Sequence, residues 1–333
     1  MKFAEASSSL QYTHINGGRT LSKPLAAVAC AAMALSYVAI LYAPTLVLRL
    51  PPPPLYKDFM IRRFICAATS SLVSVVFCYL ILPMRSREIS YFLGVLGIRM
   101  DHIWQAVVFP LSLTCLMYAG SLVLKTLLLI DSFSIYANSS GDTSFGCIKY
   151  ALKSLLDWGL SITSNILAWR NYVVAPLTEE LVFRACMVPM LLCGGFKISS
   201  VIFLCPVFFS LAHLNHFMEV YSKQNYNFIK SSLAVGFQLG YTLIFGSYAS
   251  FLFIRTGNLL APLVAHVCCN FMGLPVLFSR SKGIVSAAFL AGMVGFLWLL
   301  FPMTHPDLYN DRTNNCKCWH GYCSWNEPLK SSL

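Results

Sequence analysis

The sequence has few charged residues. Only 11% of its 333 residues are charged, whereas 57% are hydrophobic and the mean hydropathy is +0.66. A soluble domain carries about 25% charged residues. This shortage of charge excludes an ordinary soluble domain and predicts an all-α polytopic membrane protein.

Several patterns that mark other protein classes are also missing. The formal net charge is +11, but the basic residues are scattered among loops, which favours anionic lipid over nucleic acid as their partner. The thirteen cysteines show no disulfide spacing, and no HExxH zinc motif or serine or cysteine nucleophile motif occurs. Nine cysteines lie in apolar runs, where Cys behaves as a small hydrophobic residue: Cys30, Cys66, Cys78, Cys115, Cys186, Cys193, Cys205, Cys268 and Cys269.

Long apolar runs dominate the chain and predict about eight transmembrane helices. The runs lie at about residues 25–48, 63–84, 103–130, 175–194, 198–217, 232–254, 259–279 and 284–303. Charges spaced by four predict a further helix at the membrane interface, over 149–170. We therefore expect a disordered N-terminal arm at 1–24, a multi-helix membrane domain at 25–303 with a motif-bearing core at about 150–280, and a polar, Cys-containing tail at 304–333.

Two adjacent carboxylates stand out, because Glu179 and Glu180 are the only acids between Asp157 and Glu219. Placing an ionised side chain in hydrocarbon costs roughly 2.5–3.5 kcal/mol on insertion scales, so each carboxylate needs an ion-pair or hydrogen-bond partner or a role in function. On a helix Glu180 shares a face with Arg184, four residues later. Glu179 points about 100° away and has no nearby base on its own helix. Its partners must come from other helices.

The tripeptide Ala-Pro-Leu precedes Glu179 at 175–177 and precedes His266 at 261–263. Proline is favoured in the first turn of a helix and breaks later turns. The two prolines therefore predict helix starts just before both polar motifs. In a first turn the helix dipole would favour an ionised Glu179.

The polar residues of the second half are those that amide hydrolysis by water requires. A carboxylate and an imidazole, Glu179 and His213, can hold one water and take its proton. An amide and a second imidazole, Asn270 and His266, can donate to the developing oxyanion, an effect worth roughly 2.7–4 kcal/mol per donor. The sequence thus predicts a polar catalytic cavity inside the membrane, with no metal and no cofactor.

Three motifs carry a family resemblance: Glu179-Glu180-x-x-x-Arg184, Phe209-x-x-x-His213 and His266-x-x-x-Asn270. In this order, and on separate helices, they resemble the motifs of the type II CAAX prenyl proteases, the Ras-converting enzyme group of the CAAX protease and bacteriocin-processing family. The resemblance implies that Glu179 and His213 activate the water and that His266 and Asn270 form the oxyanion hole. It also implies that Glu180, anchored by Arg184, orients the site.

The resemblance further implies a reaction and a location. The substrates would be prenylated CAAX-box proteins, such as small GTPase-like proteins, which lose their C-terminal aaX tripeptide. The enzyme would be a multi-pass protein of the endoplasmic reticulum membrane.

Two other functions fit the same residues. A zinc-dependent membrane metalloprotease would use Glu179, His213 and His266 as ligands, and His216 lies on the same face as His213. A non-enzymatic membrane scaffold or transporter would keep the polar residues as packing contacts. In the tail, Cys316, Cys318, His320 and Cys323 are closely spaced for a zinc site, and we assign none there.

Overall fold

The computed structural model describes residues 21–51, 53–84, 88–140, 159–223, 225, 227–276 and 283–309. Most of the predicted arm 1–24 and of the tail 304–333 lies outside these ranges. The same holds for the first ten residues of the predicted interface helix 149–170.

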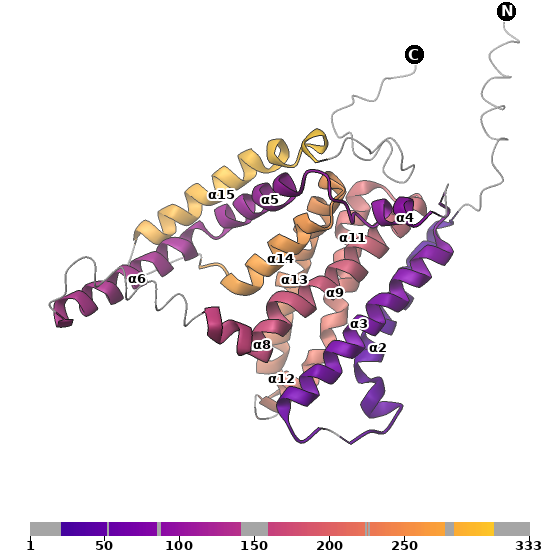
Figure 1. Cartoon of the computed structure of the whole chain (residues 1–333), viewed down its shortest axis with the longest axis horizontal. Helices are drawn as coiled ribbons and strands as arrows, with labels where there is room; N and C mark the ends of the chain where they lie inside the picture. Colours follow the sequence, from indigo (N-terminus) through magenta and orange to yellow (C-terminus); the bar gives the residue numbers. More distant parts are fainter. Residues whose placement is uncertain are drawn as a thin grey trace, which may run out of the picture.

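The described part of the chain is helical and contains no strand. Figure 1 shows the helices as a spread bundle, with the N-terminal hairpin of α2 and α3 at one end and α6 and α15 at the other. The longer helices are α2 (Lys23–Leu46), α3 (Tyr56–Ile81), α5 (Ile103–Met117), α6 (Ala119–Ser140), α11 (Ile198–Ala212), α13 (Phe228–Thr256), α14 (Leu260–Met272) and α15 (Gly283–Met303). Shorter ones are α4 (Ile89–Val95), α12 (Phe217–Lys223) and the 3-10 turns η3 (His213–His216) and η4 (Pro306–Leu308).

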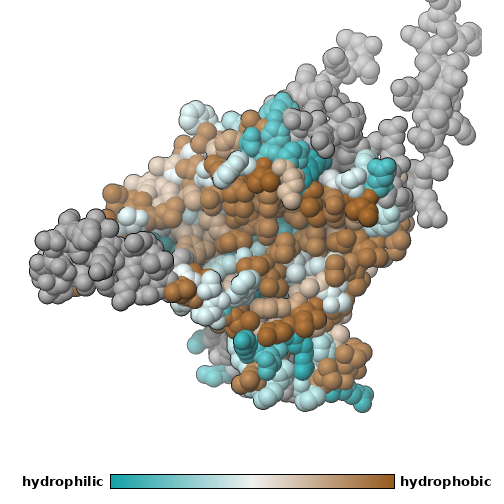
Figure 2. All heavy atoms as spheres, viewed as in Figure 1, coloured by the Kyte–Doolittle hydropathy of each residue, from teal (hydrophilic) through white to brown (hydrophobic). Residues whose placement is uncertain are grey.

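Four of the described helices, α2, α3, α13 and α15, are long and apolar enough to cross a membrane, and α5 with α6 makes a fifth if the bent pair is one span. The predicted total of about eight also includes α11 and α14, which are apolar but shorter, and the helical segment 166–193. Figure 2 shows a broad hydrophobic surface across the middle of the molecule, with hydrophilic residues above and below it. The protein is therefore an all-α multi-pass membrane protein.

The run 103–130 does not form the single helix that its length predicts. It breaks at Tyr118 into α5 and α6, whose axes differ by 79°. Tyr118 is buried there, and its hydroxyl donates to the carbonyl oxygen of Gly273 at 2.8 Å. Packing against the end of α14 thus accompanies a bend that hydropathy alone does not reveal.

The segment that carries both carboxylates is one helix of mixed winding. It runs without a break through α8 (Ile166–Trp169), the π-turn η1 (Arg170–Val174), α9 (Ala175–Glu180), the π-turn η2 (Leu181–Cys186) and α10 (Met187–Cys193). π-Turns inside α-helices are rare and are often found at functional sites. Here they lie immediately before α9 and immediately after Glu180.

The helix start predicted before Pro176 is therefore wrong, and so is the argument from the helix dipole at Glu179. Pro176 lies ten residues after Ile166, inside a continuous helix. The preceding π-turn accommodates it: the N–H of Ala175 donates to the carbonyl of Arg170, five residues back, so the α-helical ladder is already interrupted. The second prediction is correct, because Pro262 lies in the first turn of α14.

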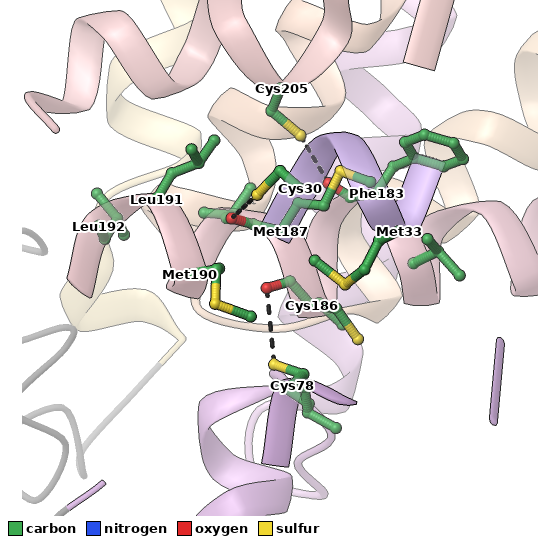
Figure 3. Packing of buried hydrophobic residues seen from close by; sticks show 14 of the residues in the cluster. Cys30, Met33, Cys78, Phe183, Cys186, Met187, Met190, Leu191, Leu192 and Cys205 are labelled. Carbon is green, nitrogen blue, oxygen red and sulfur yellow. Dashed lines mark hydrogen bonds between the residues drawn. The ribbon is translucent and has the colours of Figure 1, made fainter. Parts of the chain in front are cut away.

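Three buried thiols hold the second π-turn in place (Figure 3). Cys205 of α11 donates to the carbonyl of Phe183 at 2.6 Å, and Cys78 of α3 donates to that of Cys186 at 3.7 Å. Cys30 of α2 donates to the carbonyl of Met187 at 3.8 Å. Because π-winding disturbs the regular pairing of backbone carbonyls, these S–H groups supply additional donors from three neighbouring helices.

Two hydrophobic cores flank the polar region. The first joins α2, α3 and α4 to η2, α10, α11 and the end of α13, and the second joins α5, α13, α14 and α15. Phe183 and Phe209 of the first core, with Phe245 and Cys269 of the second, line one shared cavity. The fold thus places this cavity where the two cores meet.

Candidate active site

Four of the predicted site residues line the cavity, which has a volume of about 380 Å³. Glu179 comes from α9, His213 from the start of η3, and His266 and Asn270 from successive turns of α14. Residues far apart in the sequence therefore meet at one space large enough for several waters and a short peptide segment.

Glu180 and Arg184 do not line the cavity but lie directly behind it. Both are fully buried, and Arg184 Nη1 donates to Glu180 Oε1 at 2.9 Å. The guanidinium carbon of Arg184 lies 4.6 Å from the ring centre of Phe209 and 6.0 Å from that of Phe245. The predicted i, i+4 pair is thus formed, and two aromatic faces supply further stabilisation of the cation.

His266 links the two carboxylates. Its Nδ1 donates to Glu180 Oε1 at 2.7 Å, while its Nε2 lies 3.7 Å from Glu179 Oε2. The residue is 5% exposed, and the centre of its ring lies 5.1 Å from that of Phe245. As expected, the partner of Glu179 comes from another helix. The buried ion pair orients His266, and His266 in turn presents Nε2 to the cavity.

His213 is oriented by the backbone. Its Nδ1 lies 2.9 Å from the carbonyl oxygen of Phe209, one turn earlier. A carbonyl oxygen only accepts, so Nδ1 carries the proton and a neutral ring keeps its lone pair on Nε2. The ring also packs edge-on to Phe209, with centroids 4.7 Å apart. The contacts therefore favour His213 as a proton acceptor.

Asn270 is held by the helix segment that precedes the carboxylates. Its Nδ2 donates to the carbonyl oxygen of Asn171 at 2.8 Å. An amide nitrogen has two N–H donors, so one remains for another acceptor. Both residues line the cavity.

The structure adds residues that the motifs do not mark. The hydroxyl of Thr178 donates to the carbonyl of Val174 at 2.8 Å and accepts from Tyr37 at 3.1 Å, which ties α2 to the carboxylate helix. Gly246 leaves room for Arg184: a Cβ there would lie 2.9 Å from Pro206 Cβ and 3.3 Å from Arg184 Nη2. Neither contact has a signal in the sequence, since each depends on how separate helices pack.

Within the described residues, no three His, Cys, Asp or Glu side chains form a group that could hold a metal ion. The side chain of His216 and the tail residues Cys316, Cys318, His320 and Cys323 lie outside the described part.

The chain is similar in sequence to known proteins. Residues 161–272 match the family model described as type II CAAX prenyl endopeptidase Rce1-like, and this range contains all six predicted site residues. Over 309 residues the chain is 59% identical to CAAX prenyl protease 2 of Arabidopsis thaliana, covering 93% of this chain and 99% of that protein. The chain belongs to the type II CAAX prenyl endopeptidase family. It is thus a member of a family of protein hydrolases.

Other members of the CAAX prenyl endopeptidase family are more distant. CAAX prenyl protease 2 of Homo sapiens is 36% identical over 292 residues, which cover 84% of this chain and 81% of the human protein. That of Saccharomyces cerevisiae is 32% identical over 116 residues, 33% of this chain and 37% of the yeast protein. No solved structure matches the chain.

Proposed function

We propose that this protein is an intramembrane endopeptidase that removes the C-terminal tripeptide from prenylated CAAX proteins, small GTPase-like proteins among them. One observation carries the proposal: Glu179, His213, His266 and Asn270 surround a single cavity in a chain of the CAAX prenyl endopeptidase family. The membrane domain 25–303 would act in the endoplasmic reticulum membrane, the location that the family resemblance implies.

The first step is attack by water. Glu179 and the Nε2 lone pair of His213 hold one water molecule, and its proton passes to this pair as the oxygen attacks the carbonyl carbon of the prenylated cysteine. The hydrogen bond between His213 Nδ1 and the Phe209 carbonyl supports this role, because it fixes the tautomer in which Nε2 accepts.

Stabilisation of the oxyanion follows from the two remaining residues. The second N–H of the Asn270 amide and the Nε2–H of His266 donate to the developing oxygen anion. His266 carries both ring protons in this step, and the carboxylate of Glu180, 2.7 Å from its Nδ1, compensates its charge. Glu180 acts as a positioning residue, since it bonds to His266 and does not line the cavity, and Arg184 supports it through the ion pair with Glu180.

Collapse of the tetrahedral intermediate completes the reaction. The C–N bond breaks, and the proton taken from water passes to the leaving amine. The products are the free aaX tripeptide and a prenylated cysteine with a new carboxyl group, which loses its proton to the solvent and becomes a carboxylate. Each group thus returns to its starting protonation state.

Replacing the carboxylate tests the proposal. We expect Glu179→Ala to keep its elution volume and its thermal unfolding temperature in detergent but to release tripeptide from a farnesylated CAAX peptide at least about 100-fold more slowly. Glu88, which precedes α4 outside the cavity, provides the matched control: Glu88→Gln should retain wild-type rates. Tripeptide release by Glu179→Ala at the wild-type rate would overturn the mechanism.

Two further measurements separate the other functions. A metalloprotease predicts inhibition by a chelator together with metal in the purified protein, whereas the mechanism proposed above predicts neither. A scaffold or transporter predicts no tripeptide release by the wild-type protein.

A further inference from the structure

Two arginine side chains that the proposed mechanism does not use line the cavity. Arg63 of α3 and Arg170 of η1 both line it, and Glu179 is the carboxylate among the lining residues. Within the described residues, neither guanidinium has an Asp or Glu within ion-pair distance. Arg170 is exposed, so water screens it. Arg63 is half-buried, and its guanidinium carbon lies 6.0 Å from the ring centre of Tyr42 and 5.9 Å from that of Phe59.

The distance between Arg63 and the level of the catalytic carboxylate of Glu179 can be taken along α3. Ser71 of α3 donates to the carbonyl oxygen of Thr178, the residue before Glu179, at 3.4 Å. Arg63 precedes Ser71 by eight residues, which is about 12 Å along a helix axis. Between these two levels, Phe64 and Ala67 lie on the same helix face and line the cavity.

This distance fits the length of the group that the reaction releases. Three extended residues span at most about 10–11 Å. A substrate carbonyl held at Glu179 therefore brings the C-terminal carboxylate, three residues later, to the level of Arg63. The wall along this path is apolar, with Val38, Leu41 and Phe64, and so suits the two aliphatic residues between them.

We propose that Arg63 binds the C-terminal carboxylate of the CAAX substrate and thereby places the peptide bond three residues upstream at Glu179. This rests on the proposed function and adds a determinant of cleavage position to it. A free carboxylate that enters a partly dry cavity beside Glu179 needs a cationic partner, and a guanidinium offers two parallel N–H donors that match its geometry. The aromatic rings of Tyr42 and Phe59 position that guanidinium in the absence of substrate.

The proposal is tested by removing each charge of the contact in turn, the carboxylate of the substrate and the guanidinium of Arg63. Two farnesylated peptides ending in Cys-Val-Leu-Ser are compared, one with a free C-terminal carboxylate and one with a C-terminal amide. We expect the wild-type protein to cleave the amide with a kcat/KM about 10- to 100-fold lower, the effect of losing a charge-assisted hydrogen bond. Arg63→Gln should cleave both peptides at the rate at which the wild type cleaves the amide, so that the ratio falls to about one. Arg63→Lys should restore part of the ratio.

The neighbouring residue Arg62 provides the matched control, because its guanidinium donates to the carbonyl of Pro51 at 3.1 Å and does not line the cavity. Arg62→Gln should keep the wild-type ratio. The ratio is measured within one preparation, so partial unfolding of a variant does not alter it. An unchanged ratio in Arg63→Gln, or a ratio lost in Arg170→Gln instead, overturns the assignment while the proposed function stands. Absence of tripeptide release from the carboxylate peptide by the wild type would refute the proposed function itself.

Discussion

The buried pair of Glu180 and Arg184 gives the most quantitative prediction. Both side chains are fully buried, and they share one hydrogen bond of 2.9 Å. Removing one member of such a pair costs about 3–5 kcal/mol, because the other charge stays buried without its partner. We expect about 3 kcal/mol for Arg184→Met, since Glu180 Oε1 keeps its bond to His266 at 2.7 Å.

The double variant separates charge coupling from other effects. Glu180→Gln should also lower the free energy of unfolding by about 3 kcal/mol, because the guanidinium of Arg184 then lacks a counter-ion. With both residues replaced, no buried charge remains unpaired, and we expect a total loss of about 2–3 kcal/mol instead of about 6. The coupling energy is thus about 3–4 kcal/mol.

Unfolding in mixed micelles with increasing SDS measures these free energies, and tripeptide release measures activity on the same samples. The double variant should fold yet release tripeptide about 100- to 1,000-fold more slowly, because His266 loses the carboxylate that orients its oxyanion donor. If the two single losses add to within about 0.5 kcal/mol in the double variant, the charges are not coupled and the reasoning fails.

Two further predictions follow from contacts of the site. Asn270→Ala should lower kcat about 100- to 1,000-fold with little change in KM, because its amide donates a hydrogen bond to the oxyanion in the transition state. Steady-state kinetics measure this effect, and an unchanged kcat would exclude the role of Asn270 in the oxyanion hole. Gly246→Ala should lower the free energy of unfolding by about 1–3 kcal/mol, since the new methyl group would lie 2.9 Å from Pro206 Cβ. Gly240→Ala on the same helix, where nothing lies within 4 Å, should not destabilise, and equal effects of the two variants would contradict the packing argument.

The sequence alone determined the class of the protein and predicted the residues of its candidate site. Composition sufficed for the class, because a chain with 11% charged residues and 57% hydrophobic residues cannot expose its helices to water. The ion pair of Glu180 and Arg184 was also predictable, since a spacing of four residues brings side chains together on any helix. The need of Glu179 for a partner on another helix followed from the cost of an unpaired acid in lipid.

Only the tertiary structure decided how these residues meet. Nothing in the local pattern shows that Pro176 lies within a continuous helix, because π-turns arise where packing displaces the regular ladder. The bend at Tyr118 and the space that Gly246 leaves for Arg184 likewise depend on contacts between helices distant in sequence. Periodicity fixes which face a side chain occupies on its own helix. Which groups oppose that face is set by helix packing, and this placed His266 between Glu179 and Glu180.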